Sequence, residues 1–197
     1  ESTQLIVLRD MTQAILTYKI ARSDIQQLDL NSPDFDSITT ALPSGLYTTF
    51  RTYALRSKVL GLRAHLDRLY LPAKVQGIVP ALRRQDDLRD ALAELLKRFD
   101  APEARVRLIL DTTMEPGIIY VLLQSMNPLP AEIYREGVSV EISRASRKKP
   151  SLKQTAFISE SAFDRSRVGV DVFEILLTNK GRILEGVTSN FFYVLNN

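Results

Sequence analysis

Cysteine is absent from this chain of 197 residues, and histidine occurs only once. The lack of cysteine excludes disulfides, thiolate catalysis and thiolate zinc sites, and it fits a reducing compartment. No nucleophile motif lies near His65, so a Ser-His-Asp site is not supported. No apolar run approaches the ~20 residues of a membrane span, and residues 1–4 lack the basic start of a signal peptide. We therefore expect a cytoplasmic protein without a membrane partner.

The charge of the chain is nearly balanced, with 26 lysines and arginines against 23 aspartates and glutamates. The resulting net charge of +3 is too small to indicate nucleic acid, although it is compatible with an anionic small ligand. Glycine-rich phosphate loops, dinucleotide fingerprints and metal-ligand spacings are also missing. We expect no nucleic-acid partner and no metal site.

Two prolines in the segment 126–131 interrupt the strand-like sequence before them and mark the best linker candidate. We therefore predict an N-terminal α+β domain over 1–125, an interdomain linker over 126–131, and a second domain over 132–197. An α+β class follows because the predicted strands stand beside helices rather than alternating with them.

The spacing of apolar and β-branched residues predicts the elements of both domains. In the first domain we expect strands at 47–53, 106–110 and 118–123, a helix from about residue 62 that Pro72 kinks or ends, and a helix over 86–99. In the second domain we expect strands at 138–142, 173–177, 182–184 and 191–195, a hairpin turn at 179–181, and a helix at about 157–165.

Lys153 is the first residue that could carry chemistry. It follows a basic stretch and a proline and precedes an apolar segment, so neighbouring cations and desolvation would favour its neutral, nucleophilic amine. From the residues alone, a solvated basic surface is the commoner outcome. Glu185 is the second candidate, because the turn after it can offer backbone N–H groups and hydroxyls to an anion. An ordinary polar turn between strands is the alternative there.

The order of several segments resembles the class IV pyridoxal-phosphate enzymes, which include branched-chain aminotransferases, D-amino acid aminotransferases and aminodeoxychorismate lyases. The resemblance covers about residues 45–195. It rests on the strand sequence 47–53, on His-Leu-Asp-Arg-Leu at 65–69, on Arg144, Pro150 and Lys153, and on the segment 179–192 with its Glu-Gly-Val-Thr-Ser-Asn sequence.

The resemblance implies pyridoxal 5'-phosphate as the cofactor and assigns residues to it. Lys153 would hold the cofactor as a Schiff base and move the proton at the substrate carbon. Glu185 would face the pyridine nitrogen and keep the ring protonated, so that the ring can accept electrons. Arg68 would bind the phosphate, and Thr188 and Ser189 would lie against the cofactor.

The resemblance also assigns three residues to the substrate pocket. Tyr47 stands where the family often has an aromatic pocket residue, and Arg51 and Arg107 match arginines that could bind a substrate carboxylate. A cross-strand structural role for the two arginines is an equal alternative. The sequence departs from the family at Thr48, where a glutamate is common, and at 156–157, where Ala-Phe replaces residues that can hydrogen-bond the cofactor.

We therefore predict a two-domain architecture like that of the fold-type IV aminotransferases. Its C-terminal domain is expected to be incomplete, because family members run longer and complete the phosphate cup in a later turn. The predicted function is the transfer of an amino group between an amino acid and a 2-oxo acid by a homodimer. An aminodeoxychorismate lyase is the alternative within the family. A non-catalytic cofactor- or anion-binding protein lacking the C-terminal part of the site is the alternative outside it.

Overall fold

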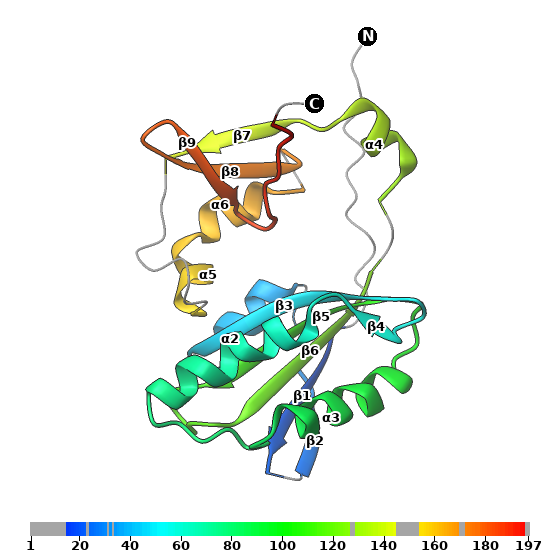
Figure 1. Cartoon of the computed structure of the whole chain (residues 1–197), viewed down its shortest axis with the longest axis vertical. Helices are drawn as coiled ribbons and strands as arrows, with labels where there is room; N and C mark the ends of the chain where they lie inside the picture. Colours follow the sequence, from blue (N-terminus) through cyan, green and yellow to red (C-terminus); the bar gives the residue numbers. More distant parts are fainter. Residues whose placement is uncertain are drawn as a thin grey trace. The chain divides into compact units, whose positions relative to one another are not determined.

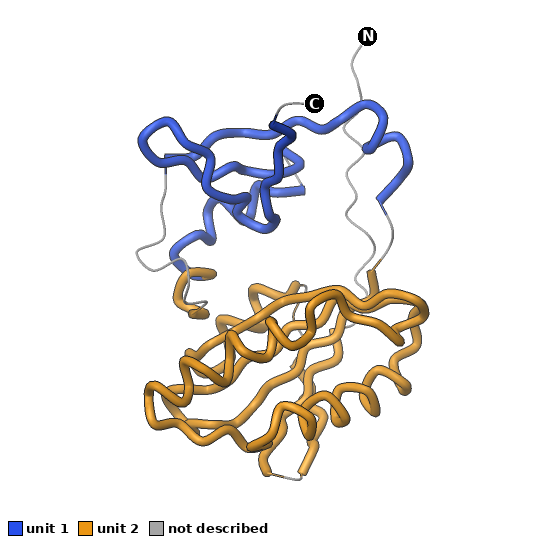
Figure 2. Tube along the Cα trace, in the orientation of Figure 1, with its two compact units in different colours: residues 1–11, 129–150, 159–197 blue, residues 12–128, 151–158 orange. Residues whose placement is uncertain are grey.

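A computed structural model describes residues 15–22, 24–30, 32, 34–126, 129–144, 154–169 and 172–195. The described residues divide into two compact units (Figure 2). We call residues up to 126 together with 154–158 the N-terminal unit, and 129–144 together with 159–195 the C-terminal unit. The chain thus leaves the N-terminal unit within the segment predicted as a linker, and returns to that unit once, at 154–158.

A six-stranded sheet with the strand order β2-β1-β6-β5-β3-β4 forms the N-terminal unit (Figure 1). Each pair of neighbouring strands is antiparallel, which agrees with the α+β prediction. The strands are β1 (Leu16–Ala21), β2 (Asp24–Leu28), β3 (Gly45–Tyr53), β4 (Lys58–Val59), β5 (Ala104–Asp111) and β6 (Ile119–Ser125).

The two faces of this sheet are covered by different helices. Helices α2 (Leu62–Val75) and α3 (Gln85–Lys97) pack on one face, and α1 (Phe35–Ala41) packs on the other (Figure 1). Because side chains alternate along a strand, β3 and β5 contribute to both cores. The side chains of Phe50 and Leu108 join the cluster under α2 and α3, whereas those of Tyr47 and Ile109 join the cluster under α1.

The strand and helix predictions for the middle of this unit are confirmed, apart from the end of α2. Strands β3 and β5 cover the predicted segments, β6 begins one residue later than predicted, at Ile119, and α3 spans 85–97 where 86–99 was predicted. Of the two outcomes expected at Pro72, the early end was wrong, because α2 continues to Val75. Leu69 and Ala73, on either side of the proline, are fully buried, and their packing holds the last turn in place. The structure also contains β1, β2 and α1, in a region where the sequence predicted no element.

A smaller sheet with the order β7-β8-β9 forms the C-terminal unit, in which β7 runs parallel and β9 antiparallel to β8. Its strands are β7 (Val140–Ser143), β8 (Glu174–Asn179) and β9 (Arg182–Gly186), and its helices are α4 (Ala131–Glu136) and α6 (Ala162–Arg167). Helix α5 (Ala156–Glu160) contains the passage from one unit to the other.

The predicted hairpin between β8 and β9 is confirmed. Lys180 and Gly181 have φ angles of 48° and 75°, which is the left-handed pair that a two-residue hairpin turn requires. The predicted helix at 157–165 is two short helices that meet at Ser161. The predicted strand at 191–195 was wrong, because none of the described strands pairs with this segment. A β-branched and aromatic sequence favours an extended backbone, but a strand also needs a hydrogen-bonded neighbour.

None of the described helices has the length and apolar character needed to cross a membrane.

Gly45 marks a close approach between β3 and β5, and its replacement tests the fold of the N-terminal unit. A Cβ added there would overlap the carbonyl oxygen of Leu110. Gly45→Ala should therefore lower the free energy of unfolding by about 3 kcal/mol, because the strands must move apart. Urea denaturation measures this loss. Gly77→Ala is the control, since it adds a Cβ into open space at a φ of 70° and should cost only about 1 kcal/mol. Equal losses in the two variants would contradict the packing described.

Candidate functional site

Glu185 lies on β9, one residue before the chain enters the turn 186–189. It pairs with Leu177 of β8, so the two side chains project from the same face of the sheet. The side chain of Glu185 is half-buried. Gly186 is buried, and a Cβ there would lie 2.5 Å from the Ser189 hydroxyl oxygen and 2.9 Å from the carboxyl carbon of Glu174. A Cβ at this position would displace the side chains of Ser189 and Glu174, so the turn is closely packed directly after the candidate carboxylate.

A buried carboxylate on β8, Glu174, holds the far side of this turn. Its side chain is 4% exposed. The Thr188 hydroxyl donates to it at 2.8 Å and the Thr188 backbone N–H at 3.2 Å, while the Ile175 backbone N–H donates at 2.9 Å. The backbone N–H of Val187 donates to the carbonyl oxygen of Ile175 at 2.9 Å. The turn is therefore tied to β8 by both side-chain and backbone hydrogen bonds.

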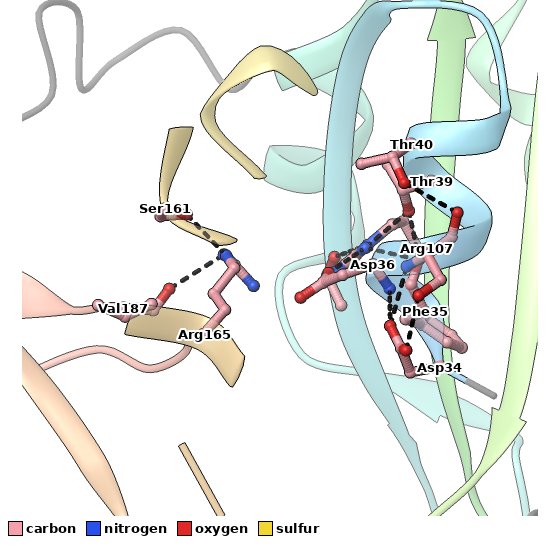
Figure 3. Close-up of polar contacts among 11 residues, drawn as sticks. Asp34, Phe35, Asp36, Thr39, Thr40, Arg107, Ser161, Arg165 and Val187 are labelled. Atoms are coloured by element: carbon pink, nitrogen blue, oxygen red, sulfur yellow. Dashed lines mark hydrogen bonds and ion pairs between the residues drawn. The ribbon is translucent and has the colours of Figure 1, made fainter. Parts of the chain in front are cut away.

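Arg165 of α6 holds the turn from another element. Its Nη2 donates to the carbonyl oxygen of Val187 at 3.0 Å, and its Nε donates to the hydroxyl of Ser161 at 2.9 Å (Figure 3). A helix and a strand thus converge on the turn 186–189, which fixes the backbone that follows Glu185.

The two hydroxyl residues assigned to the cofactor by resemblance, Thr188 and Ser189, differ in the hydrogen-bond donors that they can offer to a ligand. Thr188 donates both its hydroxyl and its backbone N–H to Glu174. Ser189 is exposed, and its hydroxyl forms no hydrogen bond with any described residue. In this geometry Ser189 keeps a free donor for a ligand, whereas Thr188 does not.

Arg68 lies on α2 with an exposed side chain. Within the described part of the chain its guanidinium forms no hydrogen bond or ion pair, so it can take an anion without losing a partner. His65, one turn earlier, is occupied differently: its Nδ1 lies 2.7 Å from the hydroxyl of Thr48, and its ring lies 5.1 Å from that of Phe50. Thr48, where the family commonly has glutamate, therefore binds a side chain of α2.

Arg107 is buried beneath α1, with a side chain that is 2% exposed. Its Nη1 donates to the Asp36 carboxylate at 2.8 Å, to the Thr39 hydroxyl at 2.7 Å and to the Phe35 carbonyl oxygen at 3.2 Å (Figure 3). Its Nε donates to the Thr49 hydroxyl at 3.0 Å. These contacts join α1 to the sheet and favour the structural alternative for this arginine.

The other two substrate candidates lie on the same face of the sheet as Arg107. Tyr47 is buried, and the centre of its ring lies 5.5 Å from the guanidinium carbon of Arg107. Arg51 is 30% exposed and forms an ion pair with Glu103, to which its Nε donates at 2.8 Å. The structure thus groups these three residues on the α1 face of the sheet, whereas Arg68 belongs to a helix on the opposite face.

Lys153 lies outside the described residues, as does most of the basic stretch before it. The residues directly after it are fixed to the N-terminal unit. Gln154 bridges to Leu46, and Thr155 exchanges hydrogen bonds of 2.9 Å with Gly45 through its backbone N–H and its hydroxyl oxygen. The chain after the candidate lysine is therefore anchored at the beginning of β3.

Sequence reasoning missed Glu174 and Arg165. The available signal for Glu174 was a single acidic residue at the start of an apolar strand, since a carboxylate entering a core needs hydrogen-bond donors. Arg165 gave no comparable signal, because its partner is a backbone carbonyl. Among the described residues no three acidic or histidine side chains gather as metal ligands.

Replacing Arg107 distinguishes a structural from a substrate-binding role. Arg107→Met leaves Asp36 and two polar groups of α1 without their partner, so the free energy of unfolding should fall by about 3 kcal/mol. Arg51→Met, which breaks a more exposed pair, should cost less than about 1 kcal/mol. Chemical denaturation of both variants measures the difference. A stable Arg107→Met chain whose only defect is a raised KM would instead assign this arginine to the substrate.

Solved structures of several proteins share this fold, among them the following three. A protein from Thermotoga maritima assigned as a branched-chain amino acid aminotransferase has 24% identity and a TM-score of 0.64. A protein assigned as a 4-amino-4-deoxychorismate lyase has 26% identity and a TM-score of 0.59. An aminotransferase-like protein from Mycobacterium tuberculosis, solved with pyridoxal phosphate bound, has 18% identity and a TM-score of 0.56.

The matches cover 87%, 81% and 87% of this chain but only 60%, 63% and 65% of the respective relatives. The chain thus spans somewhat less than two thirds of their length. A comparison with curated proteins gives no match. The resemblance noted in the sequence is nevertheless confirmed by a family model, amino-transferase class IV, which matches residues 45–197. Because that match spans well over half of the chain, the chain belongs to the class IV aminotransferase family, whose members imply pyridoxal phosphate as the cofactor.

Proposed function

We propose that this chain acts as a pyridoxal-phosphate-dependent aminotransferase that moves an amino group between an amino acid and a 2-oxo acid. The observation that carries the proposal is the turn after β9, where a half-buried carboxylate, Glu185, precedes a backbone fixed by Glu174 and Arg165. Family membership supplies the chemistry to which such a carboxylate is suited.

The residues of the chain fit the three reactive parts of the cofactor. An aldehyde requires an amine, which Lys153 supplies. A pyridine nitrogen that must stay protonated requires a carboxylate, which Glu185 supplies. A phosphate requires a cation and hydroxyl or N–H donors. The unpaired guanidinium of Arg68 and the exposed hydroxyl of Ser189 are described groups of that kind.

Each residue then has one task in the proposed reaction. When bound, pyridoxal phosphate stabilises the negative charge that develops at the α carbon of the substrate. The Lys153 amine would hold the cofactor through its aldehyde carbon and would carry the proton to and from the α carbon of the substrate. The Glu185 carboxylate holds a proton on the pyridine nitrogen, and Arg68 holds the phosphate so that the ring keeps its orientation.

Both substrates carry a carboxylate, which a pocket arginine can bind. Arg51 is the better candidate, because its guanidinium is partly exposed and has a single acidic partner, Glu103, that a substrate carboxylate can replace. Arg107 binds groups of α1, and Tyr47 packs beside this arginine.

Following the resemblance, we further propose that the protein works as a cytoplasmic homodimer.

An aminodeoxychorismate lyase is the second candidate function. It is favoured by the 26% identity to a structure assigned as such a lyase, slightly above the 24% identity to the Thermotoga maritima protein. The lyase would use Lys153 and Glu185 in the same way. The two are distinguished by the second substrate: an aminotransferase consumes a 2-oxo acid and releases another, whereas the lyase cleaves aminodeoxychorismate with no amino acceptor.

Removing the candidate lysine tests the proposal. The purified chain, incubated with pyridoxal phosphate, should show a visible absorption band that borohydride removes. The band should be absent from Lys153→Ala, because an alanine side chain offers no amine to the aldehyde. Lys97→Ala is the matched control, since it removes an exposed lysine paired with Glu94 on α3 and should leave the band unchanged.

Two results would contradict this assignment. A band of equal strength in Lys153→Ala would place the covalent bond on another lysine. A wild-type chain that develops no band at all, or that develops one but turns over neither amino acids nor aminodeoxychorismate, would support the non-catalytic alternative.

A further inference from the structure

We propose that Glu174 is a positioning residue of the cofactor site, which acts through Thr188 to fix the turn beside Glu185. The proposal rests on the function proposed above. It adds a residue that the sequence did not indicate, and it gives Thr188 a different role from the direct cofactor contact implied by resemblance.

Burying the Glu174 carboxylate costs free energy. A carboxylate that is 4% exposed has lost most of its water and must be compensated by donors or by a cation. No lysine, arginine or histidine among the described residues pairs with it. Its donors are the backbone N–H of Ile175, on its own strand, and the two groups of Thr188. Thr188 therefore provides the compensation that comes from outside β8, and the two residues depend on each other.

Stability alone does not require a carboxylate at position 174. Ile175 and Leu177, the buried neighbours of Glu174 on β8, are apolar. An apolar side chain at 174 would avoid the desolvation of a charge, and buried charges commonly contribute less to stability than apolar residues of similar size. A carboxylate instead imposes direction, because it accepts both an N–H and an O–H from one residue of the turn. Direction is what a site needs to hold a reactive carboxylate in a fixed orientation.

Other contacts of the turn 186–189 also restrict its backbone around the contact between Glu174 and Thr188. Gly186 packs against the Glu174 carboxyl group so closely that a Cβ would lie 2.9 Å from it. The backbone N–H of Gly186 donates to the Ser189 carbonyl oxygen at 3.0 Å, and Arg165 binds the Val187 carbonyl oxygen. With residues 186–188 held from three directions, the turn sets the backbone at Glu185 before them and at Ser189 after them.

Four single variants and the double variant Glu174→Gln/Thr188→Val test the proposal in the full chain. Glu174→Gln removes the charge of the carboxylate. Thr188→Val removes the hydroxyl at an exposed position, so this second variant tests the contact even if Glu174→Gln fails to fold. Thr188→Ser keeps both donors and should keep the hydrogen bonds to Glu174. Ser189→Ala is the control for direct cofactor contact. The readouts are backbone amide hydrogen exchange at residue 188 in the cofactor-free chain, the Kd for pyridoxal phosphate, and the pH dependence of the visible band.

We expect Glu174→Gln and Thr188→Val each to raise the Kd for pyridoxal phosphate by roughly tenfold. The double variant Glu174→Gln/Thr188→Val should have a Kd no higher than that of either single variant. Amide exchange at residue 188 should accelerate in Glu174→Gln and stay slow in Thr188→Ser. The pH dependence of the visible band should shift in Glu174→Gln and Thr188→Val, because the Glu185 carboxylate is no longer held in its orientation toward the pyridine nitrogen. Ser189→Ala should weaken binding without changing exchange at residue 188.

Wild-type affinity and an unshifted pH dependence in both Glu174→Gln and Thr188→Val would overturn the inference while leaving the proposed function intact. A defect in Glu174→Gln that Thr188→Val does not share would also overturn it, because the effect would not pass through Thr188. If the wild-type chain takes up no pyridoxal phosphate, the proposed function fails, and the positioning role fails with it.

Discussion

The cost of burying charge explains how the parts of this chain are joined. Three charged residues are buried in the described part of the chain, and each connects two segments through its partners. Arg107 joins α1 to β5, and Asp111 joins the end of β5 to the loop before β6 by accepting the backbone N–H groups of residues 113–115. Glu174 joins β8 to the turn after β9. Because a buried charge without partners costs several kcal/mol, each contact restricts the loop or helix that supplies the partners.

The elements predicted correctly are those whose sequence pattern depends on local packing. The secondary-structure predictions failed where a contact with a residue far along the chain determines the element. Strand β3, helix α3 and the hairpin between β8 and β9 have alternation, helical spacing or turn residues that need no further information. The segment 191–195 has the composition of a strand, yet no described strand pairs with it. Helix α1 is held by an N-cap, Asp34, and by Arg107 from a strand far along the chain, a contact that no local pattern shows.

The candidate site was predicted from the order of motifs, and its supporting residues were not. Resemblance indicated Lys153, Glu185 and Arg68, because their spacing is a property of the sequence. The roles of Arg107 and Glu174 depend on burial and on hydrogen bonds across strands, which appear only when the chain is folded. The structure accordingly favours a structural role for one predicted substrate residue, Arg107, and adds a buried carboxylate, Glu174, beside the turn 186–189.

The proposed function depends on one lysine, Lys153, that binds the cofactor covalently. Peptide mapping by mass spectrometry of the wild-type chain, after incubation with pyridoxal phosphate and reduction with borohydride, locates this bond. We expect a stoichiometric pyridoxyl group on Lys153. A label spread over exposed lysines such as Lys97 and Lys180, with none enriched at Lys153, would contradict it.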